Sequence, residues 1–178
     1  MGHRHTKEQI LEGALAAAFA DGLSQLTFGR LAKRLGISDR VIVYYFPTKD
    51  DLIGEVIVSL GGELQVKLAD AFTERAADHR ALLRAAWPVL ATKEADPVFA
   101  LFFEANGLAA AGREPYRSLL PQIIEAWIEW AASFIEGTTK RRRAEAETAI
   151  AVLDGLLLLR QLGGTAAADR AARVLGIR

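Results

Sequence analysis

The sequence contains no cysteine among its 178 residues. Disulfide bonds and thiolate chemistry are therefore excluded, which fits a protein of the reducing cytosol. Proline is scarce, with five residues, whereas alanine and leucine are abundant, and this composition favours helix. The first ten residues, MGHRHTKEQI, lack the apolar stretch of a secretory signal, so we expect a cytoplasmic protein.

Long apolar runs are also missing from the sequence. The longest, from Ala149 to Leu159, is interrupted by Asp154 and Gly155, and it is far shorter than the roughly 20 residues needed to span a bilayer. We therefore expect no association with a membrane. Hydrophobic residues still make up 51% of the chain, which is enough for a substantial core and excludes extensive disorder.

The chain has no net charge, with 22 basic and 22 acidic residues, which at first argues against nucleic-acid binding. The charge is unevenly distributed, however. Between Gly22 and Lys49 there are five basic residues and one acidic residue, Asp39, which gives a local net charge of +4. Because a binding surface depends on the local potential, this excess favours a nucleic-acid contact in this segment.

Helix-start signals occur three times near the N-terminus. Thr6 and Gln9 have the spacing of a capping box, and Thr27 and Ser38 are further N-cap residues that precede apolar residues at helical spacing. These signals predict three short helices, over residues 6–21, 27–36 and 38–46. Residues 41–46, VIVYYF, would by themselves predict a strand, but the Ser38 cap and the preceding Gly36 favour a helix.

The rest of the chain is predicted to be helical as well. The apolar spacing indicates helices over residues 48–75, 79–93, 96–111, 115–136, 142–163 and 166–175. Pro121 is expected to kink or split the helix that contains it. The basic run from Lys140 to Arg143 is expected to be a solvated loop.

Residues 27–46 have the pattern of a helix-turn-helix. The first helix has three residues that face inward: Leu31, Ala32 and Leu35. Gly36 permits a sharp turn, Ile37 fills the angle, and Ser38 opens the second helix, which buries Val41 or Ile42. A helix held in this way can enter the major groove with its N-terminal residues at the base edges.

This part of the sequence resembles the TetR (tetracycline-repressor) family over about residues 6–56. The family pattern appears here as Thr27, Leu31-Ala32, Gly36-Ile37-Ser38, Tyr45-Phe46, Lys49 and Leu52. At positions 40 and 43 the chain has Arg40 and Val43, which differ from the residues usual in the family pattern. The resemblance implies an all-α fold, in which an N-terminal three-helix helix-turn-helix domain at residues 1–50 joins a C-terminal helical ligand-binding and dimerisation domain at residues 51–178.

The resemblance also implies a set of DNA-binding residues. Phosphate contacts are assigned to Thr27, Ser38, Tyr44, Tyr45 and Lys49, and Arg30 joins the DNA-binding set. The base-reading candidates are Asp39, Arg40 and Val41. Arg40 can bind a guanine through two hydrogen bonds, worth about 1–3 kcal/mol of discrimination, and Asp39 either accepts from a cytosine or orients Arg40. Arg4 is expected to reach the adjacent backbone or minor groove, and Tyr45 and Phe46 are alternatively core anchors.

The larger C-terminal part carries an aromatic stripe with a polar end. Phe99, Phe102, Phe103 and Asn106 have the spacing i, i+3, i+4, i+7 of one helix face. With Trp87 and Trp127, the resemblance implies that they line a cavity for a small apolar or amphipathic effector, and ordinary core packing is the alternative. No cofactor and no metal are expected, although His3 and His5 resemble a metal-binding pair in spacing.

Two helices of the C-terminal part are predicted to form a homodimer interface. Residues 115–136 place apolar side chains on one face, and residues 142–163 are apolar nearly all round, so this second helix needs cover from its own core and from another chain. The predicted interface residues are Ile124, Ile128, Ile135, Leu153 and Leu157. Asp154 is expected to pair with Arg160 of the partner, with an exposed face as the alternative.

Together these features predict a homodimeric transcriptional regulator that binds double-stranded operator DNA. The resemblance implies a repressor that a small molecule releases from a palindromic operator by shifting the helix at 48–75. Within this helix, Gly61-Gly62 is a bend, a close packing point or a helix break. The alternative is a helical small-molecule-binding protein with a vestigial DNA module. An enzyme is disfavoured because no cluster of histidine and carboxylate is expected, with His79 in a predicted loop.

Overall fold

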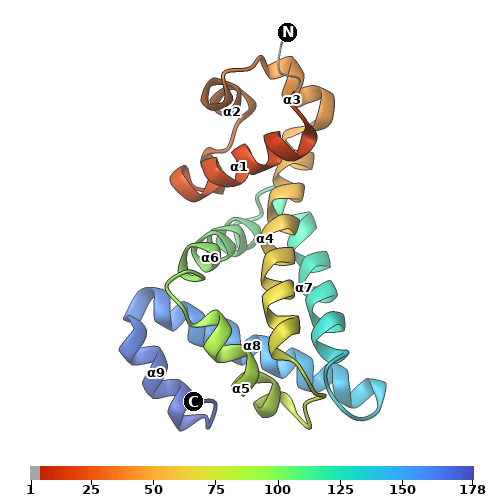
Figure 1. Cartoon of the computed structure of the whole chain (residues 1–178), viewed down its shortest axis with the longest axis vertical. Helices are drawn as coiled ribbons and strands as arrows, with labels where there is room; N and C mark the ends of the chain where they lie inside the picture. The colour runs from red at the N-terminus through yellow and green to blue at the C-terminus, as the bar shows by residue number, and fades with distance from the viewer. Residues whose placement is uncertain (1–4) are drawn as a thin grey trace. The chain divides into compact units, whose positions relative to one another are not determined.

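The computed structural model describes residues 5–178, and over this range the chain is built from helices (Figure 1). They are α1 (Lys7–Asp21), η1 (Leu23–Gln25), α2 (Phe28–Leu35), α3 (Asp39–Tyr45), α4 (Lys49–Ala71), α5 (His79–Leu90), α6 (Asp96–Ala110), α7 (Tyr116–Ala132), α8 (Thr139–Gly163) and α9 (Thr165–Val174). An isolated bridge between Ala76 and Ile135 is the β pairing found within the described residues. The predicted all-α fold class is confirmed.

Two of the three predicted N-caps form as expected. The Thr6 hydroxyl accepts from the amide of Gln9 at 3.3 Å, while the Thr6 amide donates to the Gln9 side chain at 3.1 Å, which completes the capping box. The Thr27 hydroxyl accepts from the amide of Arg30 at 3.3 Å. Ser38 also precedes its helix with extended backbone, but its side chain makes no capping hydrogen bond, so this part of the prediction was wrong.

The chain divides into two compact units. The first contains residues 1–61 and 101–120, and the second contains residues 62–100 and 121–178. The helices α4, α6 and α7 therefore contribute to both units. The predicted domain boundary between residues 50 and 51 divides a DNA-binding part from a ligand-binding part. A division by packing does not test a division by function, so this boundary stays a prediction.

The first unit has its core where α1, α2 and α3 meet. Ile10, Ala14 and Ala18 of α1 are fully buried, as the helical spacing predicted, and Leu31 and Ile42 are equally buried on α2 and α3. Burial of these side chains fixes the three short helices against each other, because helices of this length are marginal on their own. Phe19 of α1 lies outside this core, with 44% of its surface exposed.

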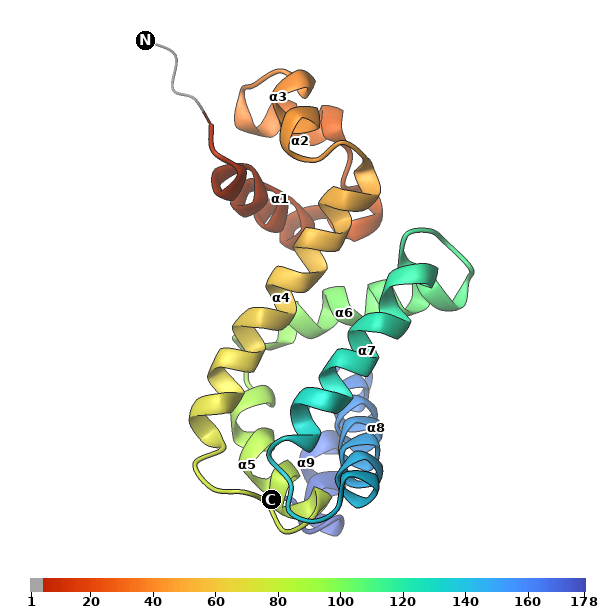
Figure 2. The same ribbon diagram turned by 90° about the vertical axis from the view of Figure 1, so that its right-hand side faces the viewer.

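In the second unit α8 packs against both α5 and α9 (Figure 2). The buried contacts come from small and branched apolar residues, among them Leu82, Leu83, Leu90, Ala146, Ala149, Leu156, Ala168 and Ala172. The predicted loop at Lys140–Arg143 was wrong, because these residues form the first turn of α8. Thr138 explains the difference: it accepts from the Arg141 amide at 3.4 Å and starts the helix earlier.

Pro121 was predicted to kink or split its helix, and the helix is not split. It lies within α7, which continues from Tyr116 to Ala132. Because proline has no N–H, α7 lacks one backbone hydrogen bond at Pro121, yet the helix continues past it.

Gly36 and Gly62 make a matched pair for a stability test. Gly36 ends α2 with φ 67° in the left-handed region, whereas Gly62 lies inside α4, and a Cβ would meet nothing within 4 Å at either position. Replacing Gly36 by alanine should therefore lower the free energy of unfolding by about 1 kcal/mol, and Gly62→Ala should raise it by about 0.5–1 kcal/mol. Urea unfolding of both variants measures this, and equal effects would contradict the assigned backbone conformations.

Candidate DNA-binding interface

The turn between α2 and α3 is held by the backbone. The left-handed Gly36 reverses the chain, and the amide of Ile37 donates to the carbonyl of Ala32 at 3.1 Å, which satisfies one of the last carbonyls of α2. Ala32 is 4% exposed, and its small side chain lets α3 cross close to α2. The predicted helix-turn-helix geometry is present (Figure 1).

The helix α3 has one buried face and one exposed face. Ile42 and the following Phe46 are buried in the core of the first unit. Ser38, Asp39 and Arg40 are exposed at its N-terminal end. The exposed side is completed by Val43 and Tyr44, the latter 80% exposed. The segment that could have been a strand is thus a helix whose N-terminal residues are accessible.

The basic residues of this region also lie at the surface. Arg30, Arg40 and Lys49 are exposed, and Lys49 is the first residue of α4. One guanidinium nitrogen of Arg30 donates to the Gln25 side chain at 2.6 Å, which holds Arg30 near the start of α2. Thr27, predicted to contact phosphate, is half-buried and accepts the capping bond of α2.

Tyr45 has a role that the sequence did not reveal. It is half-buried, and its hydroxyl donates to the backbone carbonyl of His5 at 3.1 Å, so it ties the segment before α1 to α3. Its ring makes an edge contact with Tyr44 at 4.9 Å between centroids. To donate to a phosphate, Tyr45 would have to release the bond to His5. His3 and Arg4 lie outside the described residues.

The predicted effector-binding residues are distributed over both compact units. Trp87 and Phe99 are buried and Trp127 is half-buried in the second unit, whereas Phe102, Phe103 and Asn106 are half-buried in the first. Trp127 contacts Trp130 at 5.3 Å between ring centroids, and Trp130 in turn contacts the rings of Phe72 and Phe134. Their role in effector binding stays a prediction.

The predicted dimer residues differ in the surface that they leave for a second chain. Ile135 and Leu157 are 0% and 1% exposed within the single chain, and Ile128 is also buried. Ile124 and Leu153 are half-buried. Larger apolar side chains are exposed on α8 at Leu158, Leu159 and Leu162, with 41%, 38% and 81% of their surface accessible.

Arg160 does not have the free guanidinium group that pairing with a partner's Asp154 would require. It is buried and binds Asp96 of its own chain, with Nε–Oδ1 and Nη2–Oδ2 distances of 2.6 and 3.0 Å. The expected pair between Asp154 and Arg160 was therefore wrong. Burial raises the pKa of Asp154 to about 6, and its carboxylate makes no ion pair among residues 5–178.

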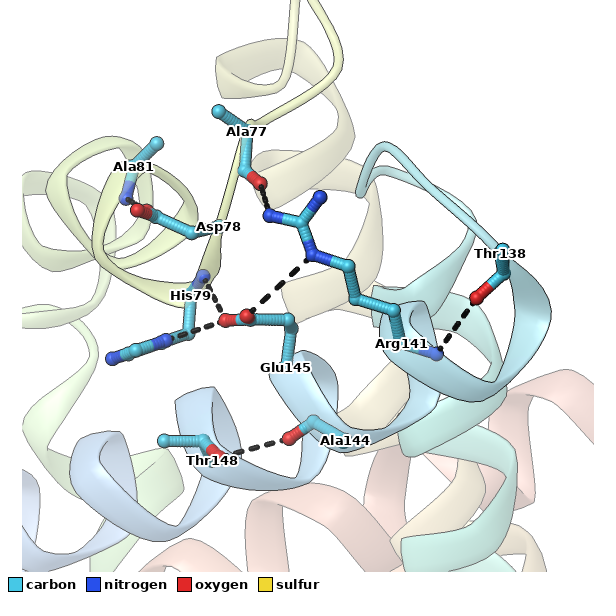
Figure 3. A network of polar contacts seen from close by, with 9 residues as sticks. All are labelled: Ala77, Asp78, His79, Ala81, Thr138, Arg141, Ala144, Glu145 and Thr148. Carbon is cyan, nitrogen blue, oxygen red and sulfur yellow. Dashed lines mark hydrogen bonds and ion pairs between the residues drawn. The ribbon is translucent and has the colours of Figure 1, made fainter.

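A histidine and a carboxylate do meet in the second unit, contrary to expectation (Figure 3). His79 is the first residue of α5 rather than part of a loop, and its Nδ1 lies 2.5 Å from Oε2 of Glu145 on α8. The same carboxylate oxygen accepts from the His79 amide at 2.9 Å, and Arg141 donates to the carbonyl of Ala77 at 2.9 Å. These bonds fasten the start of α5 to α8.

This network predicts a measurable pH dependence of stability. The hydrogen bonds from His79, the backbone amide first, hold the pKa of Glu145 below its usual value of 4.5. A lowered carboxyl pKa stabilises the fold above pH 4.5, and the gain disappears as the pH falls through the folded-state value. Glu145→Gln should thus cost about 1 kcal/mol at pH 7 and progressively less below pH 4.5. Urea unfolding from pH 7 to 3 tests this, and a difference that stays constant would contradict it.

The described residues do not contain a group of three or more histidine, aspartate or glutamate side chains placed to hold a metal ion. Over the same residues, none of the helices combines the length and the hydropathy that crossing a membrane requires.

Three short helices with an accessible α3, followed by a larger helical part, define a helix-turn-helix protein of the DNA-binding regulator class. Residues 10–56 match the family model described as "Bacterial regulatory proteins, tetR family", about a quarter of the chain. This match confirms the resemblance to the TetR family found in the sequence. A comparison with curated proteins gave no match.

Solved structures share the fold over nearly the whole chain. A transcriptional regulator from Rhodococcus sp. Rha1 is 19% identical, with 96% of this chain and 94% of that chain covered and a TM-score of 0.74. A TetR transcription regulator from Haloarcula marismortui is 20% identical, with coverages of 95% and 93% and a TM-score of 0.70. A protein from Saccharomonospora viridis, described as a transcriptional regulator and solved in complex with choline, is 21% identical, with coverages of 95% and 92% and a TM-score of 0.69.

Proposed function

We propose that this regulator is a homodimeric repressor that binds a palindromic operator and is released by a small-molecule effector. DNA-binding transcriptional regulation follows from the family, and the accessible N-terminal end of α3 supports the more specific proposal. Asp39, Arg40 and Val41 are the proposed base-reading residues on this end of the helix. The proposed backbone contacts come from Thr27, Arg30, Ser38, Tyr44, Tyr45 and Lys49.

The chemistry of these residues suits the two kinds of contact. Arg40 is exposed on the first turn of α3, where a guanidinium can donate two hydrogen bonds to one guanine. Tyr44 lies near the end of the same helix with 80% of its surface accessible, and its hydroxyl can donate to a phosphate oxygen. Lys49 is exposed at the first residue of α4, where its ammonium group can bind a phosphate oxygen.

Selection from a random DNA library with the purified chain tests this proposal. We expect enrichment of a palindrome whose half-sites lie about one helical turn apart, roughly 34 Å, because a two-fold dimer presents two copies of α3. Failure to enrich any palindrome at moderate salt would reject the proposal. It would favour the alternative, a helical small-molecule-binding protein with a vestigial DNA module.

The proposed dimer uses α7 and α8 of each chain. Leu158, Leu159 and Leu162 supply exposed apolar surface on α8. The half-buried Asp154 carboxylate makes no ion pair in the described chain, which suits a group supplied by a partner. Sedimentation measurements should show a dimer that Leu162→Lys weakens. Val58→Lys, at an exposed site of α4 in the first unit, is the matched control. Equal effects of both substitutions would contradict this interface.

The proposed effector is a small apolar or amphipathic molecule, bound by the predicted residues around the stripe of α6. Its binding would change the position of α4, which begins directly after the DNA-reading segment. A thermal-shift screen of amphipathic compounds, choline included, identifies ligands that are then tested for release of DNA. Linkage requires that DNA weaken the ligand's affinity by the same factor, so an unchanged ligand affinity at saturating DNA would reject the coupling.

A further inference from the structure

Glu104 of α6 binds the backbone of the turn that leads into the DNA-reading segment. Its Oε2 accepts from the Leu23 amide at 2.8 Å, and its Oε1 accepts from the Ser24 amide at 2.9 Å. Both amides belong to the first residues of η1 and would otherwise lack a partner within that helix. Hydrogen bonds to an ionised carboxylate are stronger than those between neutral groups, so this is a firm contact.

Gly22 makes room for the carboxylate. Its φ of 89° is rarely adopted by other residues, and a Cβ at this position would lie 3.0 Å from Oε2 and 3.2 Å from Oε1 of Glu104. The neighbouring Leu23 side chain is fully buried, so the turn is fixed from its side chain as well as from its amides. The turn between α1 and α2 is therefore shaped around a residue that lies more than 80 positions further along the chain.

The same helix is anchored a second time, at its first residue. Asp96 begins α6 and binds Arg160 of α8 within the second unit, whereas Glu104 lies in the first unit. Both anchors belong to α6, where they are eight positions apart in the sequence. Phe99, Phe102 and Phe103, the proposed effector-binding residues, lie between them in the sequence.

We propose that Glu104 is a positioning residue that couples α6 to the DNA-reading helices, as a second connection in addition to α4. The proposal rests on the proposed function. An effector that moves α6 at its aromatic residues would pull on the Leu23 and Ser24 amides, and so on the segment that enters α2. Conversely, DNA that orders α2 and α3 would restrain α6 through the same carboxylate, because coupling is reciprocal.

The test compares Glu104→Ala and Glu104→Gln with Glu63→Ala in the full chain. Glu63 is an exposed residue of α4, so its replacement removes the same negative charge without touching the turn. Without DNA, hydrogen exchange of the Leu23 and Ser24 amides is measured by NMR. With the DNA selected by the wild type, the affinity, its salt dependence and the exchange of residues 101–110 are measured.

We expect the Leu23 and Ser24 amides of Glu104→Ala to exchange at least about tenfold faster than in the wild type. Affinity for the selected DNA should fall about 5- to 20-fold with an unchanged salt slope, because no phosphate contact is removed. Glu63→Ala should bind as tightly as the wild type or slightly more tightly, since it removes only a repulsive charge. Glu104→Gln should lie between the wild type and Glu104→Ala, because its amide oxygen still accepts one of the two bonds.

Hydrogen exchange of the α6 amides distinguishes coupling between α6 and the DNA-reading helices from a contact that only stabilises the turn. DNA should slow exchange at residues 101–110 in the wild type and leave it unchanged in Glu104→Ala. If the Leu23 and Ser24 amides of Glu104→Ala exchanged as slowly as in the wild type, the proposal would be overturned, whether or not DNA is bound. Equal DNA affinities of Glu104→Ala and Glu63→Ala would also overturn it. Absence of any selected DNA for the wild type would instead reject the proposed function, and the DNA-free exchange would still decide whether Glu104 holds the turn.

Discussion

Replacing Arg40 and Tyr44 together by alanine is expected to lower the affinity for the selected operator on the order of 100-fold. In the proposed complex Arg40 contributes base discrimination and Tyr44 a phosphate contact, and the proposed dimer would lose each of them twice. Both side chains are exposed, so the free energy of unfolding should change by no more than about 0.5 kcal/mol. Fluorescence anisotropy with labelled DNA measures the affinity, and urea unfolding measures the stability.

Arg170→Ala provides the control for the loss of positive charge. Arg170 is exposed on α9 in the second unit, and its replacement changes the net charge by the same amount as Arg40→Ala. If the affinity depended only on overall charge, Arg40→Ala and Arg170→Ala would weaken binding equally. That result would contradict a specific role for α3.

Asp96→Ala is expected to cause the largest loss of stability among the substitutions considered. It leaves the guanidinium of Arg160, whose side chain is 4% exposed, without its carboxylate partner. Removal of one member of a fully buried pair costs about 3–5 kcal/mol, and because the side chain of Asp96 is 34% exposed we expect a smaller loss of about 2–3 kcal/mol. The hydrogen bonds that Arg160 donates to Asp96 raise the pKa of Arg160. The guanidinium stays charged even without this partner, because arginine is not deprotonated in proteins.

The double variant Asp96→Ala, Arg160→Met separates the cost of an uncompensated charge from the value of the pair. We expect it to recover most of the stability lost in Asp96→Ala, because no buried charge remains. All variants are compared by urea unfolding at one protein concentration, since a dimer's stability depends on concentration. A double variant that is less stable than Asp96→Ala would show that the pair itself supplies the stability.

The N-terminal helices could be predicted from the sequence because their signals are local. Thr6 and Thr27 cap their helices within three residues, and Gly36 marks the turn by a backbone conformation that other residues rarely adopt. Each signal acts over a single helical turn, so the pattern and the structure agree. Ser38 is the exception: the residue type indicated the correct helix start, but its hydroxyl makes no capping bond.

The contacts that the sequence did not reveal join residues far apart in the chain. Glu104 binds the amide of Leu23, and His79 binds Glu145, at separations of 81 and 66 positions. No periodicity or spacing rule relates such residues, because their proximity depends on how the helices pack. For the same reason the sequence could not show that Arg160 is bound within its own chain.

The type of a residue also did not predict whether its side chain is accessible for binding. Ile135 and Leu157 have the apolar side chains of an interface, yet both are almost fully buried within the chain. The four basic residues that begin at Lys140 suggested a solvated loop, but Thr138 starts a helix just before them. Apolar spacing identifies the inward face of a helix, and it does not distinguish a face that covers its own core from one that covers a partner.

The central claim is that the N-terminal end of α3 reads the bases of the operator, and the DNA sequences selected by two forms of the chain test it directly. The wild type and Arg40→Ala are each used to select from the same random library. We predict that Arg40→Ala selects the same half-site spacing but loses the preference for guanine at one position of each half-site. Identical sequence preferences for the two forms would contradict the assignment of Arg40, and with it the proposed reading by α3.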